Sequence, residues 1–465
     1  MRRLLFPLLA SLALTACGRP ASLLEEVKSG GELVVATRNS PTTYYEGPNG
    51  PTGLEYDLAR LFAEELGVRL RLEIPENFDA ILPMVIRGDV HLAAAGLTIT
   101  EARKKLVRFG PSYQSITPQL VYRQGMPRPR NLDELDGILE VVAGSSHEER
   151  LKALKKEHPG LSWCANRELE SEELLALVWE QVIDYTIADS NEFRLNQRFY
   201  PELRVAFDID EPEQLAWAFA HGEDSSLFDA ARAFFNRIRA DGTLAQLIER
   251  HYGHVQNFDY VGTRLYLRHI QQRLPEFIDL FQKAAQETGL DWRLLAAIGY
   301  QESHWRPKAR SPTGVRGIMM LTLDTMRHLG LDNRLDPEQS ILGGARYIAM
   351  MHDKIPERIP EPDRTWMALA AYNVGFGHLE DARRLTQMNG GDPDKWVDVK
   401  KNLPLLAKKK WYKKTRYGYA RGHEPVRYVE NIRSYYDILV WYSEQNREPA
   451  IRPAFNGVLT DFPTL

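Results

Sequence analysis

One glutamate in the C-terminal half of the chain stands where a carboxyl group could act as a catalytic acid. The segment 290–305 reads LDWRLLAAIGYQESHW and predicts a helix with Asp291 as its N-cap. Leu295, Ile298 and Glu302 are separated by three and four residues, so they share one face of that helix. The apolar stripe of the helix therefore ends in a carboxylate.

The residues that follow Glu302 suggest apolar surroundings. His304 and Trp305 come directly after it, and we expect them to form a wall of low dielectric. Burial disfavours the charged form of a carboxyl group and raises its pKa, as a general acid that protonates a glycosidic oxygen near neutral pH requires. Taken alone, Glu302 fits a catalytic acid and a buried structural pair equally well.

Four short motifs, in order along the chain, favour the catalytic interpretation. They are Glu302-Ser303, SPTGVRGIMM at 311–320, AAYNVG at 370–375 and EPVRYV at 424–429. Together they resemble the lytic transglycosylases with a soluble-lytic-transglycosylase, goose-lysozyme-like domain. The resemblance implies a mostly α-helical lysozyme-like domain that acts on the glycan strands of peptidoglycan.

The resemblance also assigns roles to individual side chains. Glu302 matches the single catalytic acid and base of the family. Ser311 matches a serine that helps to orient the N-acetyl group of the substrate. Tyr372 and Asn373 match an aromatic side chain and an amide of the cleft, and Tyr428 matches the tyrosine of the last motif.

Two further motif positions and two other carboxylates qualify this match. Glu424 takes the opening position of the last motif, whereas Met320 stands where many relatives have Gln. Loss of that amide removes one hydrogen bond to sugar but leaves the acid chemistry intact. Asp324 and Asp363 are the nearest candidates for a second catalytic carboxylate, and Asp324 is better explained as a surface helix residue.

The reaction implied by the resemblance needs one carboxylate. Glu302 would protonate the oxygen of the β-1,4 bond between N-acetylmuramic acid and N-acetylglucosamine. It would then take a proton from the muramoyl 6-hydroxyl as that oxygen attacks C1, giving a 1,6-anhydro end without water. The alternatives are a hydrolytic lysozyme, which normally uses two carboxylates, and a non-catalytic cell-wall sensor whose helical domain only binds glycan.

The N-terminal half alternates short β-rich runs with amphipathic segments from residue 31 to about 254, which predicts an α/β domain. It contains GELVVAT at 31–37, GLEYDLA at 53–59 and GLTITEAR at 96–103. These motifs resemble the type II periplasmic solute-binding proteins of the polar amino acid family. The resemblance implies a two-lobed domain, here fused to an enzyme and therefore suited to sensing.

A ligand site follows from the same resemblance. Arg103, Gly96 and Thr98 would hold the α-carboxylate of an amino acid or muropeptide ligand, since a guanidinium group suits a planar anion. Asp189 would meet the ligand amino group.

Aromatic Tyr44 or Tyr45 would cover the ligand side chain. The local alternative is that Thr100 caps a helix and Arg103 balances Glu101, in a domain that has lost its ligand.

The first residues predict export and a lipid anchor. A charged start and an apolar run over 4–14 precede LTAC at 14–17, which resembles a bacterial lipobox with Cys17 as the lipidated residue. Gly18 after the cysteine favours the outer membrane. Only Cys164 then remains as a thiol, so no internal disulfide forms.

The 465 residues provide for two or three domains. We expect a signal peptide at 1–16, a tether at 17–30, the solute-binding-like domain at 31–258, a linker at 259–268 and the catalytic domain at 269–465. Residues 261–465 hold 31 Lys and Arg against 24 Asp and Glu, and the rest hold 28 against 39. The two domains therefore face different partners.

A basic stretch, KKKWYKKTR at 408–416, interleaves cations with aromatic residues. Outside the cytoplasm, stem-peptide carboxylates or lipid headgroups fit it better than nucleic acid, and a solvated basic loop is the alternative. No metal or cofactor is predicted, because His251 and His254 are isolated from acidic clusters and no metal-ligand spacing or phosphate-binding glycine loop occurs.

Overall fold

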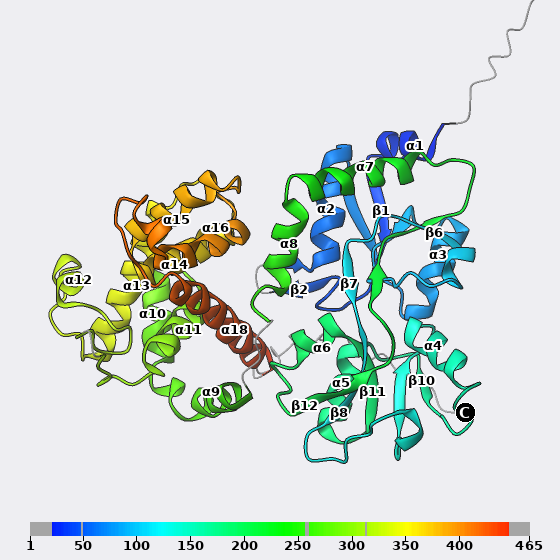
Figure 1. The fold of residues 1–465 in the computed structure, drawn as a ribbon, viewed down its shortest axis with the longest axis horizontal. Helices are drawn as coiled ribbons and strands as arrows, with labels where there is room; N and C mark the ends of the chain where they lie inside the picture. The colour runs from blue at the N-terminus through cyan, green and yellow to red at the C-terminus, as the bar shows by residue number, and fades with distance from the viewer. Residues whose placement is uncertain (1–20, 48–49, 256–259, 312–313, 446–465) are drawn as a thin grey trace, which may run out of the picture.

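A computed structural model describes residues 21–47, 50–255, 260–311 and 314–445. An α/β domain and a helical domain lie side by side, with the long C-terminal helix running from one toward the other (Figure 1). This arrangement agrees with the predicted order of an α/β half followed by a helical half. Cys17 lies outside the described residues.

The α/β domain has two lobes, each built on a five-stranded sheet. The first sheet has the order β4-β1-β5-β14-β6, in which β1 is parallel to β4 and β5. The second has the order β10-β9-β11-β8-β12. The antiparallel pair β7–β13 joins the lobes, and β2–β3 form a hairpin. The strands are β1 Glu32–Ala36, β2 Tyr45–Gly47, β3 Gly50–Thr52, β4 Arg69–Glu73, β5 Leu92–Ala93, β6 Val107–Phe109, β7 Gln114–Ile116, β8 Pro118–Arg123, β9 Leu139–Val142, β10 Cys164–Asn166, β11 Tyr185–Asp189, β12 Leu203–Asp208, β13 Glu213–Leu215 and β14 Ala218–Ala220.

Helices cover these sheets because each carries one apolar face. On α2, Leu58 and Phe62 are fully buried four residues apart. The helices are α1 Leu23–Gly30, α2 Leu54–Leu66, α3 Ile81–Arg87, α4 Ser146–Leu154, α5 Ser171–Glu180, α6 Ser190–Asn196, α7 Ser226–Ala240 and α8 Thr243–Tyr252. The expected tether at 17–30 differs from the structure, since α1 buries Val27 and the Leu24 amide donates to Ser226 Oγ at 3.0 Å.

The helical domain surrounds one apolar core. Its helices are α9 Tyr260–Gln272, α10 Ile278–Thr288, α11 Trp292–Ser303, α12 Leu323–His328, α13 Pro337–Lys354, α14 Asp363–Val374, α15 Phe376–Met388, α16 Trp396–Asn402, α17 Lys409–Tyr412 and α18 His423–Gln445. The expected linker at 259–268 is mostly helical here. Tyr266 of α9 is fully buried, and its hydroxyl donates to the Tyr435 carbonyl at 3.0 Å, so this helix belongs to the core.

Buried charges join the two domains along α18. The guanidinium of Arg198 and the ring of His254, both from the α/β domain, contact Asp437 Oδ2 at 2.5 and 2.6 Å. Arg433 of α18 lies 3.2 Å from Glu249 Oε1 of α8. Burial lowers the pKa of His254 to about 3, so the ring is neutral in this contact.

Each of the two histidines, predicted to lie away from acidic clusters, pairs with one carboxylate in the fold. His254 meets Asp437 from across the domain boundary, and His251 Nε2 lies 2.8 Å from Asp57 Oδ2 of α2. The partners in each pair are more than 180 residues apart, so the sequence alone does not reveal them. Across the described ranges, no group of three metal-ligating side chains forms, and no helix there has the length and apolarity that a membrane span requires.

Candidate active site

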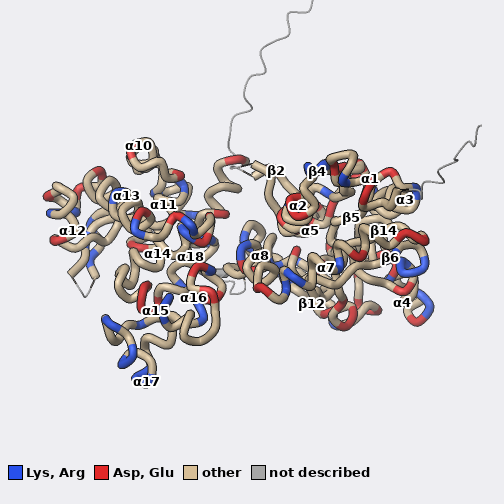
Figure 2. Tube along the Cα trace, turned by 90° about the horizontal axis from the view of Figure 1, so that it is seen from above, with Lys and Arg blue, Asp and Glu red and all other residues tan. Residues whose placement is uncertain are grey.

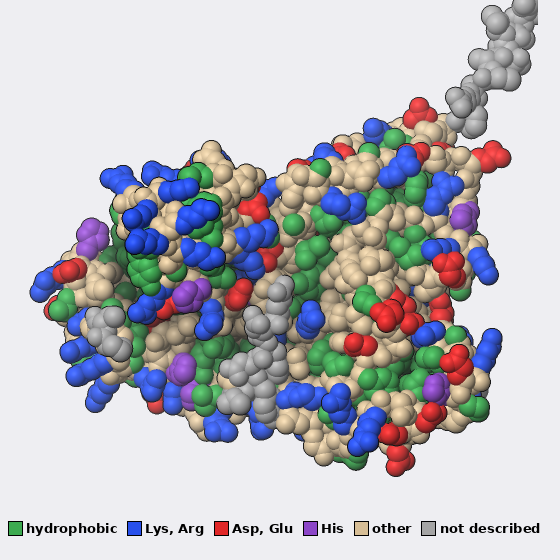
Figure 3. Space-filling view, viewed as in Figure 1, with side chains coloured by type: hydrophobic (Ala, Val, Ile, Leu, Met, Phe, Trp, Pro, Cys, Tyr) green, Lys and Arg blue, Asp and Glu red, His purple; other side chains and the backbone are tan. Residues whose placement is uncertain are grey.

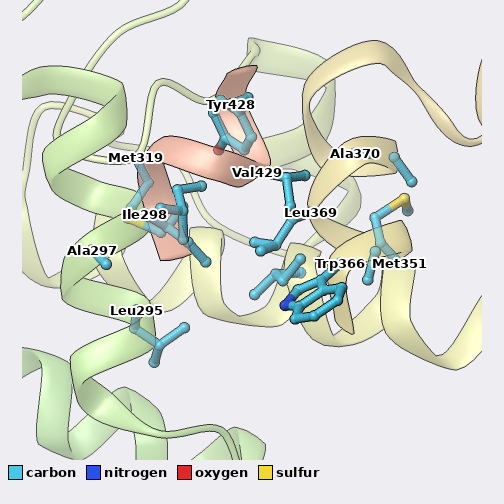
Figure 4. Close-up of a cluster of buried hydrophobic side chains, with 14 of the residues drawn as sticks. Leu295, Ala297, Ile298, Met319, Met351, Trp366, Leu369, Ala370, Tyr428 and Val429 are labelled. Carbon is cyan, nitrogen blue, oxygen red and sulfur yellow. The ribbon is translucent and has the colours of Figure 1, made fainter. Parts of the chain in front are cut away.

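Helix α11 positions Glu302 at the end of an apolar stripe. Asp291 caps the helix by accepting the Arg293 amide at 2.8 Å. Leu295 and Ile298 are fully buried, and both appear beneath Tyr428 in Figure 4. The helix ends at His304, whose φ of 51° is left-handed. The expected spacing therefore places Glu302 where the core reaches the surface.

Glu302 is half-buried and hydrogen-bonded. The hydroxyl of Tyr428, on α18, donates to Glu302 Oε1 at 2.6 Å. Burial raises the pKa of Glu302 to about 7, although the hydrogen bond from Tyr428 favours the carboxylate and opposes that rise. Near neutral pH the side chain can therefore both give and accept a proton.

Tyr372 completes an aromatic wall beside this carboxyl group. Its ring is stacked with that of Tyr428, with centroids 6.4 Å apart and planes 15° apart. Its hydroxyl donates to the Met319 carbonyl at 2.9 Å. Burial and the nearby charge of Glu302 raise the pKa of both tyrosines well above the usual value, so both hydroxyls keep their protons.

The loop that carries Met319 is held by close backbone packing. Gly317 has a φ of +89°, and a Cβ there would lie 1.9 Å from the Arg334 carbonyl oxygen. The Met319 amide donates to Ser340 Oγ at 3.2 Å, and its side chain fills the space beside Gly344. The carbonyl that receives Tyr372 is therefore fixed in position.

The other residues that the resemblance assigns to the site lie on the loop that carries Met319 and on α14. Ser311 Oγ accepts the Val315 amide at 3.3 Å, at the start of the described part of the same loop. Met320 is half-buried with a φ of +46°, directly after Met319. Asn373 is exposed next to Tyr372. Tyr428 therefore contacts Glu302 directly, whereas Ser311, Met320 and Asn373 lie on the loop and the helix that adjoin Met319 and Tyr372.

Glu424 is exposed at the start of α18 and pairs with Arg421 at 3.2 Å. Asp324 is exposed beside Arg327, and Asp363 is buried with Oδ1 accepting the Trp396 amide at 2.7 Å. Among the residues that the structure describes, no other carboxylate contributes to the pKa shift of Glu302. In the described part of the chain, Asp324, Asp363 and Glu424 are thus each paired with groups other than Glu302.

Trp305 differs from its expected position. Its indole nitrogen donates to the Ala296 carbonyl at 2.8 Å, and its ring packs on Tyr300 and Tyr266 in the core. The wall beside Glu302 comes instead from Tyr428 and Tyr372, which are distant in sequence.

Two polar groups near the site escaped the sequence analysis. The Met319 carbonyl accepts the hydroxyl of Tyr372, and Asn431 donates to Oε1 of Gln301, the residue before Glu302, at 3.1 Å. The one available signal was the spacing of Asn431, three residues after Tyr428 on the same helix.

A second site lies between the lobes of the α/β domain. The cavity is lined by Arg38, Phe78, Gly96, Thr98, Arg103, Val142, Ser145, Ser146, His147, Ser171, Asp189 and Glu192. It brings together Gly96, Thr98, Arg103 and Asp189, as the resemblance implied. Phe78 supplies its aromatic side chain, and Tyr44 and Tyr45 are not part of this lining.

The protein's own acceptors occupy the guanidinium of Arg103. Its Nε donates to Glu149 Oε1 at 2.7 Å, Nη1 to the Thr98 carbonyl at 3.4 Å and Nη2 to the Gly144 carbonyl at 3.0 Å. Glu149 and Gly144 belong to the opposite lobe, so these bonds hold the lobes together. Glu101 pairs with Lys104 instead of Arg103, which differs from the local alternative.

The other groups of this cavity are also paired internally. Asp189 Oδ1 lies 2.9 Å from His147 Nε2, and the Gly96 amide donates to Glu55 Oε1 at 2.9 Å. Arg38, which the sequence analysis did not single out, pairs across the lobes with Glu170 and Glu192. The cavity therefore has charges of both signs, and its lobes are closed on their own ion pairs.

Comparisons with known proteins match the two halves of the chain to different families. Residues 33–254 match the bacterial extracellular solute-binding proteins, family 3, and residues 279–394 match the transglycosylase SLT domain. The membrane-bound lytic murein transglycosylase F 1 of Alkalilimnicola ehrlichii is 54% identical over 92% of this chain and 87% of its own length. The membrane-bound lytic murein transglycosylase F of Ectopseudomonas mendocina is 52% identical over 96% and 92%. The chain therefore belongs to the family of membrane-bound lytic murein transglycosylase F.

Solved structures also resemble the N-terminal half. An ancestral arginine-binding protein bound to arginine is 25% identical over 48% of this chain and 98% of that chain, with a TM-score of 0.44. The family matches confirm both resemblances drawn from the motifs, and with the two-lobed topology they confirm the predicted fold class.

Proposed function

We propose that this chain cleaves the β-1,4 bond between N-acetylmuramic acid and N-acetylglucosamine in peptidoglycan without water, leaving 1,6-anhydromuramoyl ends. The names of the relatives and the match to the transglycosylase SLT domain support this class of enzyme. The observation that carries the proposal is the single half-buried Glu302, with a pKa of about 7 and a hydrogen bond from Tyr428.

The chemistry follows from that one group. Protonated Glu302 gives its proton to the glycosidic oxygen as the C1–O bond breaks, which leaves positive charge on the muramoyl ring. The resulting carboxylate takes the proton of the muramoyl 6-hydroxyl while that oxygen bonds to C1. Glu302 ends protonated and no water is consumed. Tyr428 stabilises the carboxylate between the two steps, because its hydroxyl is already aimed at Oε1.

The neighbouring residues provide the substrate cleft in this proposal. Tyr372 and Tyr428 would offer stacked rings to a sugar, and Ser311, Met320 and Asn373 would border the bound strand. Met320 cannot donate a hydrogen bond, so sugar contacts at that position are apolar.

Digestion of purified peptidoglycan tests the reaction. Mass spectrometry should find muropeptides one water lighter than lysozyme products, and Glu302→Gln should lower the rate by at least 10²-fold. Reducing-end products of ordinary mass would establish a hydrolytic lysozyme instead. Binding without cleavage by the wild-type chain would support a glycan-binding sensor.

We further propose that the protein is anchored to the outer membrane by lipid on Cys17, facing the periplasm. The motif at 14–17 supports this, as does the description of the relatives as membrane-bound. Cys17→Ala should move the protein from the membrane fraction to the soluble periplasmic fraction. If Cys17→Ala stays in the membrane fraction, another part of the chain anchors the protein.

The α/β domain, in our proposal, binds an amino acid or wall-derived peptide and regulates cleavage. A ligand carboxylate would bind Arg103 in place of Glu149, because that side chain already occupies the guanidinium from the opposite lobe. Thr98 and Gly96 would border the carboxylate, and Asp189 would receive an ammonium group in exchange for His147. Ligand binding would then shift the equilibrium of the lobes by its differential affinity.

Calorimetry with amino acids and purified stem peptides tests this site. Arg103→Ala should abolish binding, whereas Glu149→Gln should strengthen it, since the internal competitor is weakened. Cleavage assays with and without ligand test the coupling. Binding that survives Arg103→Ala would rule out the assigned site, and binding that leaves the cleavage rate unchanged would rule out regulation.

A further inference from the structure

We propose that a basic surface on the helical domain docks the enzyme onto the carboxylates of peptidoglycan stem peptides outside the catalytic cleft. This inference rests on the proposed function for the identity of the polymer. The basic surface is formed by residues 408–419. It contains Lys408, Lys409, Lys410, Trp411, Tyr412, Lys413, Lys414, Arg416, Tyr417 and Tyr419.

Charge is the first argument. All five lysines and Arg416 are exposed, and no acidic residue occurs between Lys408 and Glu424. Within the described ranges, none of these six cations lies within an ion-pair distance of a carboxylate, and the next cation along, Arg421, pairs with Glu424. The tube view shows this positive charge around α17 at the outer edge of the helical domain (Figure 2).

The surface is built on a fixed loop. Fully buried Asp381 accepts the backbone amides of Arg416 and Tyr417 at 3.0 and 2.7 Å. The Ala420 amide donates to the Leu406 carbonyl at 3.2 Å, which closes the base of the loop. The cations therefore start from a rigid frame, so ordering them on a partner costs less entropy.

Aromatic rings are set among the charges. The ammonium groups of Lys410 and Lys414 lie 5.8 and 5.0 Å from the centroid of Trp411. Tyr417 and Tyr419 are 53% and 57% exposed, so each offers ring surface to a partner. A partner that combines sugar rings with carboxylates fits both features.

The loop of the basic surface connects to the helices that carry the two tyrosines of the site. Tyr417 packs on Gly377, where a Cβ would lie 2.8 Å from its ring, and Gly377 lies on α15 directly after the helix that carries Tyr372. At its other end the loop leads into α18, which carries Tyr428. Figure 3 shows basic side chains gathered on this part of the helical domain. In this proposal, a glycan strand bound at Glu302 also contacts these charges.

A binding experiment tests the proposal without cleavage. The full chain carrying Glu302→Gln and Cys17→Ala is sedimented with purified sacculi at increasing NaCl. The test variant adds Lys408→Gln, Lys409→Gln and Lys413→Gln, which spare the lysines beside Trp411. We expect the test variant to bind sacculi about tenfold more weakly than the parent at low salt. Added NaCl should weaken its binding less than that of the parent, because the ion pairs that salt screens have been removed.

The matched control removes three exposed lysines of the α/β domain, Lys104, Lys105 and Lys156, by substitution with Gln. It should bind sacculi like the parent chain. Sacculi stripped of stem peptides by an amidase should bind the parent and the test variant equally. The three test substitutions are also placed in a chain that keeps Glu302. Turnover of short soluble glycan lacking stems should be the same with and without them, which shows that the fold is intact.

Three results would overturn the inference. They are equal binding of the test variant and the control to sacculi, undiminished binding of the parent to stripped sacculi, and a tenfold loss on vesicles of anionic phospholipid with none on sacculi. The last would assign the surface to lipid. None of these depends on bond cleavage, so failure of the proposed reaction would be seen separately in the digestion products.

Discussion

Tyr428→Phe should move the pH dependence of cleavage upward. The tyrosine hydroxyl lies 2.6 Å from Glu302 Oε1 and stabilises the carboxylate. A hydrogen bond to a charged group contributes about 1.5 to 3 kcal/mol, and about 1.4 kcal/mol corresponds to one pKa unit. Because Glu302 is only half-buried, water will replace part of this stabilisation, and we expect its pKa to rise from about 7 by about one unit.

The assay is the pH profile of kcat/KM for release of anhydromuropeptides. The acid form of Glu302 starts the reaction, so activity falls as pH rises through its pKa, and this alkaline limb should move upward by about one pH unit in Tyr428→Phe. Tyr372→Phe is the matched control, since its hydroxyl bonds to the Met319 carbonyl and not to Glu302. An unmoved limb in Tyr428→Phe, or an equal shift in the control, would refute this account of the acid.

Three further outcomes follow from the contacts described. Because the folded-state pKa of Glu302 is raised to about 7, wild-type stability should fall as pH rises from about 4.5 to 7, so Glu302→Gln should gain about 1 to 3 kcal/mol at pH 8 in denaturant unfolding and almost nothing at pH 4. Gly317→Ala should cost about 3 kcal/mol and lower Tm, because its Cβ would meet a carbonyl, whereas Gly314→Ala, also at positive φ but in open space, should cost about 1 kcal/mol. Asp437→Asn should lower the free energy of unfolding by about 2 kcal/mol, because it leaves Arg198 poorly paired. Differential scanning calorimetry should show the domains separating at a lower temperature, and an unchanged profile would contradict this prediction.

Local spacing predicted those parts of the site that lie on one element. The position of Glu302 at the end of a buried stripe followed from its spacing to Leu295 and Ile298, because helical periodicity is a local property. The neighbours of Glu302 did not follow from it. Trp305 is close in sequence yet faces the core, while Tyr428 reaches the carboxyl group from 126 residues away.

Pairing across the chain explains the other differences. The sequence places His254 away from acidic clusters, and packing of α18 on the α/β domain brings one carboxylate, that of Asp437, to its ring. Arg103 lines the cavity, and its bond to Glu149 depends on how the two lobes close, which the motif does not encode. Motifs identify such groups, but only the folded chain determines their partners.

Helix α18 gives the enzyme a mechanical property. Asp437 meets the α/β domain, and Tyr428, nine residues earlier, touches Glu302. At 1.5 Å per residue these points are about 13 Å apart on one rigid rod, so a tilt of about 5° about one end moves the other by about 1 Å. That displacement is enough to break a hydrogen bond of 2.6 Å. A tilt of α18 against the α/β domain would therefore weaken the hydrogen bond from Tyr428 and raise the pKa of Glu302.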